Sequence, residues 1–159
     1  MKRIFVVSII VAMALLAACG GGGSSTSSTS PTTTTTSTQM PGTPVSVTGG
    51  GTYWSITPAQ FAGFKTKDFV LADTDTVYIG EIQGTDLFIN SDKISQELDK
   101  FPADKSTKIV VYCAVGVKSQ TVAATLVQAG YTRVMQLEGG LMAWQQQGYP
   151  IISKTRTLS

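Results

Sequence analysis

The chain has 159 residues, with 12 Lys+Arg, 10 Asp+Glu, no histidine and a formal net charge of +2. A nearly neutral chain without runs of like charge argues against a nucleic-acid partner. The lack of histidine removes Ser-His and Cys-His catalysis and most zinc and copper sites, so we expect no metal and no cofactor.

The first 18 residues have the pattern of a cleaved secretory signal. A short basic start precedes an apolar run over residues 4–16, which is too short to span a bilayer. The run ends in Leu-Ala-Ala-Cys at residues 16–19, which resembles the lipobox of bacterial lipoproteins and implies cleavage before Cys19 and its acylation. An ordinary cleaved signal or an uncleaved anchor would give a similar pattern. We expect a lipid anchor on the outer side of the cytoplasmic membrane, or in the periplasm at the outer membrane.

Residues 19–52 are rich in Gly, Ser and Thr, and none of them is charged. Such a segment cannot bury enough apolar surface to offset the entropy of ordering, so it predicts a flexible tether behind the lipidated cysteine. The remaining residues, 53–155, are about 100 in number and are sufficient for one compact domain.

The first half of this domain gives signals for two helices and two strands. Thr57 and Pro58 predict a helix start, with Thr as the N-cap and Pro at the first position. The apolar run at 69–72 predicts a buried strand, and 86–89 predicts a weaker one. Apolar residues spaced over 94–101 predict a short helix.

The second half alternates strands and helices more clearly. Residues 108–112 form the strongest strand pattern, and a helix through 122–127 follows, with Gly130 at its C-terminal cap. A further strand at 133–137 precedes a helix at 141–147. This alternation predicts an α/β domain with a mainly parallel sheet and helices on both of its faces.

Cys113 lies directly after the strongest strand and directly before a helix, where open α/β sheets place their ligand sites. Backbone N–H groups of the loop and the helix N-terminus would stabilise an anion there, and so would favour the reactive thiolate. If Cys19 carries lipid, Cys113 has no disulfide partner. The alternative is a buried cysteine that packs as a small apolar group.

Three segments in the same order resemble the rhodanese family. Residues 113–119 match its active-site pattern of Cys, two variable residues, Gly, one variable residue, Arg and a hydroxyl residue, with Lys118 in the place of Arg. Residues 137–144 match Leu-x-Gly-Gly-x-x-x-Trp, and residues 80–85 resemble Gly-His-Ile-Pro-Gly-Ala. The resemblance covers about residues 53–152 and implies the rhodanese-like α/β fold.

The resemblance also implies a sulfurtransferase. Cys113 would take a sulfane sulfur from a small anionic donor of the thiosulfate or polysulfide type, hold it as a persulfide, and pass it to a thiol, a cyanide-like acceptor or a protein acceptor. Lys118 would offer a cation to the donor, and Ser119 a hydroxyl. The implied substrate-binding residues are those that follow Cys113 in the loop: Ala114, Val115, Gly116, Val117, Lys118 and Ser119.

Two departures from the family pattern concern the donor. Lys118 keeps the positive charge but lacks the planar fork that binds an oxyanion through two hydrogen bonds. The family's Asp-Val-Arg is replaced by residues 73–75, Asp-Thr-Asp. If Asp75 lies near the site, its charge would oppose anionic donors and the thiolate; otherwise Asp73 and Asp75 only cap their loop.

Two other functions remain as alternatives. A non-catalytic rhodanese-like module could bind a partner or sense redox state through Cys113, although modules that have lost activity often lack the cysteine. Phosphatases of the same fold need one more residue between Cys and Arg than the four that separate Cys113 from Lys118. For Trp144 and the glycine pair 139–140 we expect structural roles, as core and as a tight strand-to-helix turn.

Overall fold

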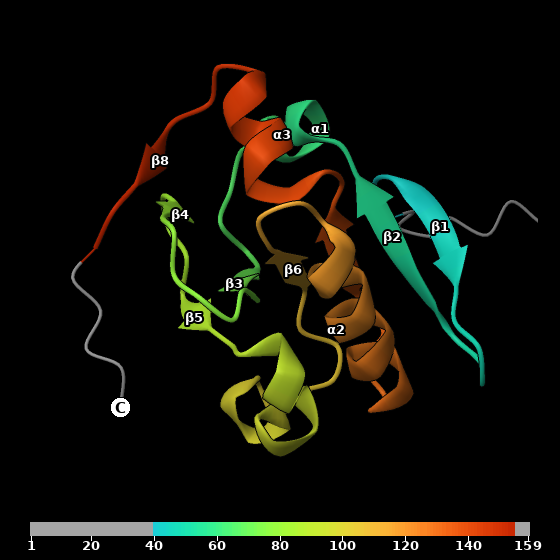
Figure 1. Ribbon diagram of the computed structural model, residues 1–159. Helices are drawn as coiled ribbons and strands as arrows, with labels where there is room; N and C mark the ends of the chain where they lie inside the picture. The colour runs from blue at the N-terminus through green and yellow to red at the C-terminus, as the bar shows by residue number, and fades with distance from the viewer. Residues whose placement is uncertain (1–39, 155–159) are drawn as a thin grey trace, which may run out of the picture. The chain divides into compact units, whose positions relative to one another are not determined.

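The computed structural model describes residues 40–154 (Figure 1). Its main sheet has six strands in the order β1-β2-β7-β6-β3-β5, in which only the β1–β2 pair is antiparallel. In chain order these strands are β1 (Thr43–Ser46), β2 (Thr52–Ile56), β3 (Val70–Asp73), β5 (Leu87–Phe88), β6 (Ile109–Tyr112) and β7 (Val134–Leu137). A separate antiparallel pair joins β4 (Glu81–Ile82) to β8 (Ile151–Ile152).

Helices pack on both faces of the main sheet, as predicted. The α-helices are α1 (Pro58–Ala62), α2 (Val117–Gln128) and α3 (Gly140–Gln146), and two 3-10 helices are η1 (Ser91–Gln96) and η2 (Leu98–Lys100). Helices α1 and α3 contact each other and lie side by side (Figure 1). None of the helices within residues 40–154 is long and apolar enough to cross a bilayer.

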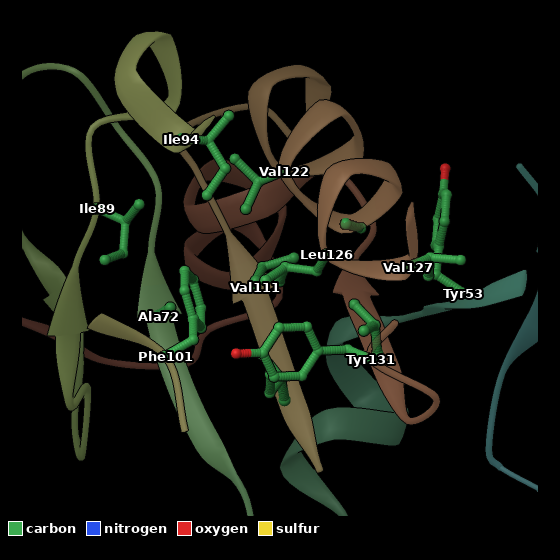
Figure 2. Packing of buried hydrophobic residues seen from close by; sticks show 13 residues of the cluster. Tyr53, Ala72, Ile89, Ile94, Phe101, Val111, Val122, Leu126, Val127 and Tyr131 are labelled. Carbon is green, nitrogen blue, oxygen red and sulfur yellow. The ribbon is translucent and has the colours of Figure 1, made fainter. Parts of the chain in front are cut away.

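Strand β6 shows how the two faces divide the core. Its residues alternate, with Ile109 and Val111 in one buried apolar cluster and Val110 and Tyr112 in the other. The first cluster lies under α2, where Val111 and Leu126 share it (Figure 2). The second cluster holds the side chains of α1 and α3 and includes buried Trp144, so the predicted core role of Trp144 is confirmed.

The predicted helix start at Thr57 is confirmed by a complete capping box. The Gln60 N–H donates to the Thr57 hydroxyl over 3.2 Å, and the Thr57 N–H donates to Gln60 Oε1 over 2.9 Å. Pro58 occupies the first helical position, where its missing N–H costs nothing. The predicted strands at 69–72, 108–112 and 133–137 also form, within one or two residues of their expected ends.

The structure corrects two of the expectations. The ordered chain starts before residue 53, because β1 pairs with β2 in a stretch assigned to the tether. Strand β1 is an edge strand with mostly exposed side chains, so it lacks the apolar alternation of a buried strand. The short helix expected over 94–101 is instead the two 3-10 turns η1 and η2. The expected signal peptide and the lipidated Cys19 lie outside the described residues.

Candidate active site

Cys113 lies at the carboxyl end of β6, a central strand of the parallel part of the sheet. Its side chain is buried, and the Gly116 N–H donates a hydrogen bond to the Cys113 Sγ over 3.1 Å. Gly116 is the N-cap of α2 and has φ +90°, a left-handed conformation that favours glycine. The loop therefore turns one amide, at the positive end of a helix, directly onto the sulfur.

The first turn of α3 supports this loop through backbone hydrogen bonds. The Leu141 N–H donates to the Cys113 carbonyl over 2.8 Å, and the Met142 N–H donates to the Ala114 carbonyl over 2.9 Å. A Cβ at Gly140 would lie 2.0 Å from the Cys113 carbonyl oxygen. The glycine pair thus forms the tight turn that was expected, and Gly140 also lets the two backbones approach closely.

Gln136 is a site residue that the sequence reasoning missed. It is buried on β7, where its Nε2 donates to the Gly116 carbonyl over 3.3 Å and to Ser119 Oγ over 3.1 Å. The Ser55 hydroxyl donates to Gln136 Oε1 over 3.3 Å. Gln136 therefore ties the start of α2 to the sheet. One signal was present: a polar side chain in an otherwise apolar, four-residue strand.

Ser119 does not lie where the resemblance implied. Its side chain is fully buried, and its hydroxyl donates to the Gly116 carbonyl over 2.9 Å while it accepts from Gln136. Because both hydrogen-bond partners of this hydroxyl lie inside the protein, it does not point toward a sulfur donor bound at the loop. We correct its role from substrate contact to support of the Gly116 turn.

Asp75 lies at the site, next to the Cys113 loop. Asp75 is buried, with 5% of the residue exposed, and the Ala114 N–H is near enough to its carboxylate to affect its pKa. Burial raises the pKa of Asp75, although the Ala114 N–H and the nearby Lys118 charge act in the opposite direction. The Lys118 Nζ itself donates to Thr76 Oγ1 over 2.5 Å. Among the loop amides, that of Gly116 therefore faces the sulfur and that of Ala114 lies near Asp75.

Exposed apolar side chains surround this loop. Val115 belongs to the loop, Val117 begins α2, and Met142 lies in the α3 turn that supports the loop. Val77 and Ile79 follow Thr76, which Lys118 contacts. These five are the large apolar residues that are at least half exposed within the described chain, and all of them belong to segments in or next to the loop or to the segment that follows Thr76, which Lys118 contacts.

A family comparison agrees with this geometry. The model of the rhodanese-like domain matches residues 78–147. The chain is 35% identical over 83 residues to the thiosulfate sulfurtransferase GlpE of Coxiella burnetii, a match that covers 51% of this chain and 76% of that protein. The chain belongs to the rhodanese-like family.

Two other similarities describe this rhodanese-like chain further. It is 39% identical over 56 residues to a sulfurtransferase of Allochromatium vinosum, which is 35% of this chain and about half (50%) of that protein. A rhodanese-related protein from Thermoplasma volcanium has a similar structure, with a TM-score of 0.56 and 25% identity over 64% of this chain and 100% of that one. The predicted fold is confirmed, with a mostly parallel central sheet covered by helices.

Proposed function

We propose that the chain is a sulfurtransferase that carries sulfur as a persulfide on Cys113. The observation that supports this most is the Gly116 N–H, at the start of α2, directed onto the sulfur of a cysteine at the end of a central parallel strand. Sulfur transfer needs a nucleophilic sulfur, and an amide directed at it can donate a hydrogen bond to the anionic forms of that sulfur. The sulfurtransferase names of the relatives agree with this chemistry.

The transfer takes two displacement steps without net oxidation. The Cys113 thiolate attacks the outer sulfur of the donor, the donor's S–S bond breaks, and its electron pair leaves on sulfite when the donor is thiosulfate. Cys113 then holds a persulfide, Cys–S–S⁻. A thiol, cyanide or a protein acceptor attacks the outer sulfur, and the electron pair of the S–S bond returns to Cys113 as thiolate.

The surroundings of Cys113 suit the persulfide as well as the thiolate. Both forms are anions, so the Gly116 amide and the α2 N-terminus stabilise either one. The Gly116 carbonyl is fixed by Ser119 and Gln136, which keeps the amide of that turn in place. An amide that is held before the reaction needs no reorganisation when the charge moves from one sulfur to the next.

A turnover assay tests the proposal. The purified full-length chain is given thiosulfate or a polysulfide as donor and cyanide as acceptor, and thiocyanate is measured. We expect turnover with at least one donor and none above background for Cys113→Ser, which removes the thiolate and retains the volume. Absence of turnover with every donor and acceptor would favour the alternative, a non-catalytic module that binds a partner or senses redox state.

The location of the domain is proposed separately. The signal-like start and the Leu-Ala-Ala-Cys segment support a lipid anchor at Cys19, which would hold the domain at the outer side of the cytoplasmic membrane or at the outer membrane. Cys19→Ala should release the protein from membranes in detergent-free extracts. Retention of the Cys19→Ala protein in the membrane fraction would contradict lipidation at this residue.

A further inference from the structure

We infer that Asp75 determines donor specificity: its carboxylate occupies part of the anion-binding loop, so that the site prefers sulfane-sulfur donors of low charge over the dianion thiosulfate. The inference rests on the proposed sulfurtransferase function, and it concerns which donor reaches Cys113. In this respect the chain would differ from the Coxiella burnetii relative, which is named a thiosulfate sulfurtransferase.

The backbone places Asp75 firmly at the loop. The Thr74 N–H and the Thr74 hydroxyl both donate to the Tyr112 carbonyl, over 2.7 and 2.8 Å, so residue 74 is attached to the residue that precedes Cys113. The Asp75 N–H donates to Asp73 Oδ1 over 3.0 Å. Three hydrogen bonds therefore fix this turn and hold residue 75 beside the start of the Cys113 loop.

The Asp75 carboxylate competes with a sulfur donor for the Ala114 N–H of the loop. Near this carboxylate lies the N–H of Ala114, the first amide after the nucleophile, which acts to lower the pKa of Asp75. A donor oxyanion that approached Cys113 would compete with Asp75 for this amide. The Gly116 amide already faces the Cys113 sulfur, which further reduces the number of loop amides left for a ligand.

The charge balance at the loop disfavours a dianion. Lys118 is the cation of the loop. Its Nζ donates to Thr76, the residue after Asp75, and its positive charge attracts the Asp75 carboxylate. The positive charge of Lys118 is thus opposed by the buried carboxylate of Asp75, with the buried carboxylate of Asp73 in the same turn. Coulomb repulsion by Asp75 is twice as large for a dianion as for a monoanion at the same distance, and it is absent for a neutral donor.

The exposed apolar residues near the loop add a second, independent preference for donors that carry a hydrocarbon group. The exposed apolar side chains offer contacts to hydrocarbon groups; they are Val77, Ile79, Val115, Val117 and Met142. Thiosulfate has no such group, whereas an organic hydropersulfide, R–S–SH, has one. With that donor the Cys113 thiolate attacks the terminal sulfur, the S–S bond breaks, and R–S⁻ leaves while Cys113–S–SH forms. Atoms and charge balance without any oxidant or reductant.

The test compares two donors on the full-length chain. The rate of sulfur loading on Cys113 is followed by quenched-flow intact mass with thiosulfate and with the hydropersulfide of 2-mercaptoethanol. The wild type should load faster from the hydropersulfide. Asp75→Asn, which keeps an oxygen for the Ala114 N–H, should raise the rate with thiosulfate on the order of tenfold and should change the hydropersulfide rate by less than about threefold.

Two further variants make the result specific. Asp99→Asn removes the same charge from an exposed position on η2 and should leave both rates unchanged. Asp75→Ser repeats the loss of charge if the Asn variant folds poorly. Equal changes with both donors would overturn the inference and leave the sulfurtransferase proposal standing. Failure of every donor to load Cys113 in the wild type would overturn both.

Discussion

Gly140 of α3 lies directly against the backbone of Cys113. A Cβ at Gly140 would stand 2.0 Å from the Cys113 carbonyl oxygen and 2.8 Å from the Gly116 nitrogen, and the residue has φ +59°. The Leu141 N–H donates to that same carbonyl over 2.8 Å. The loop that carries Cys113 therefore packs directly on the first turn of α3. This close packing is possible only because residue 140 has no side chain.

Gly140→Ala should displace the Cys113 loop. The new methyl cannot fit without backbone movement, so we expect a loss of more than about 3 kcal/mol in the free energy of unfolding and a large fall in sulfur loading. Gly148→Ala is the matched control, because Gly148 also has positive φ (+82°) but has nothing within 4 Å of its Cβ position. Its cost should be only about 1–2 kcal/mol, measured by urea denaturation. Similar losses in both variants would mean that the close approach is unimportant.

Gln136→Leu should loosen the start of α2. The substitution keeps the side-chain volume but removes the donors to the Gly116 carbonyl and Ser119 Oγ. We expect a destabilisation of about 1–3 kcal/mol and slower sulfur loading, because the Gly116 amide is no longer held toward Cys113. Ser119→Ala should cost less, since the Gly116 carbonyl keeps its Gln136 partner. A Gln136→Leu protein that loads sulfur at the wild-type rate would show that this support is dispensable.

Asp75 should make stability depend on pH. Burial raises the pKa of Asp75 above the value of 3.8 expected for the unfolded chain. The folded state then holds this proton to higher pH than the unfolded state, so the free energy of unfolding falls as the pH rises from about 4 through the folded pKa. Asp75→Asn removes this loss. The difference in Tm, variant minus wild type, should grow in favour of the variant between about pH 3 and about pH 7. A constant or shrinking difference would contradict it.

Lys118→Arg should improve the use of thiosulfate. A guanidinium can keep the contact with Thr76 and still present a second N–H to a donor oxygen, whereas the lysine ammonium, within residues 40–154, donates to Thr76. We expect a rise of a few-fold, about 2- to 5-fold, in kcat/KM for thiosulfate. Lys118→Gln should lower it, because Asp75 then faces the donor without an opposing charge. An arginine variant no better than the parent would show that cation geometry does not limit the site.

Local signals were sufficient for most of the fold. Helix α1 is specified by its own capping residues, Thr57 and Pro58, and strand β6 by its own apolar run, without help from distant residues. The elements that escaped prediction depend on pairing. Strand β1 is ordered by β2, and the two-residue strands β4 and β8 exist only through each other, so their sequences carry little pattern of their own.

The site divides in the same way. Cys113, Gly116 and Lys118 were predicted because they match the positions of the family's active-site pattern within one loop. The roles of Gln136 and Gly140 come from β7 and α3, which reach the loop only in three dimensions. Asp75 could be suspected from its charge, but only the turn fixed by Thr74 brings it to Ala114, and Ser119 was misplaced because a helix start has an inner as well as an outer face.

The most direct test of the sulfur-carrier role is the mass of the protein itself. The full-length chain is incubated with thiosulfate, polysulfide or hydropersulfide, and intact mass and peptide mapping are measured before and after addition of cyanide. We predict a gain of about 32 Da, one sulfur atom, on the peptide that contains Cys113, its loss on addition of cyanide, and no gain for Cys113→Ser. An unchanged mass with all three donors would contradict a persulfide carrier at Cys113.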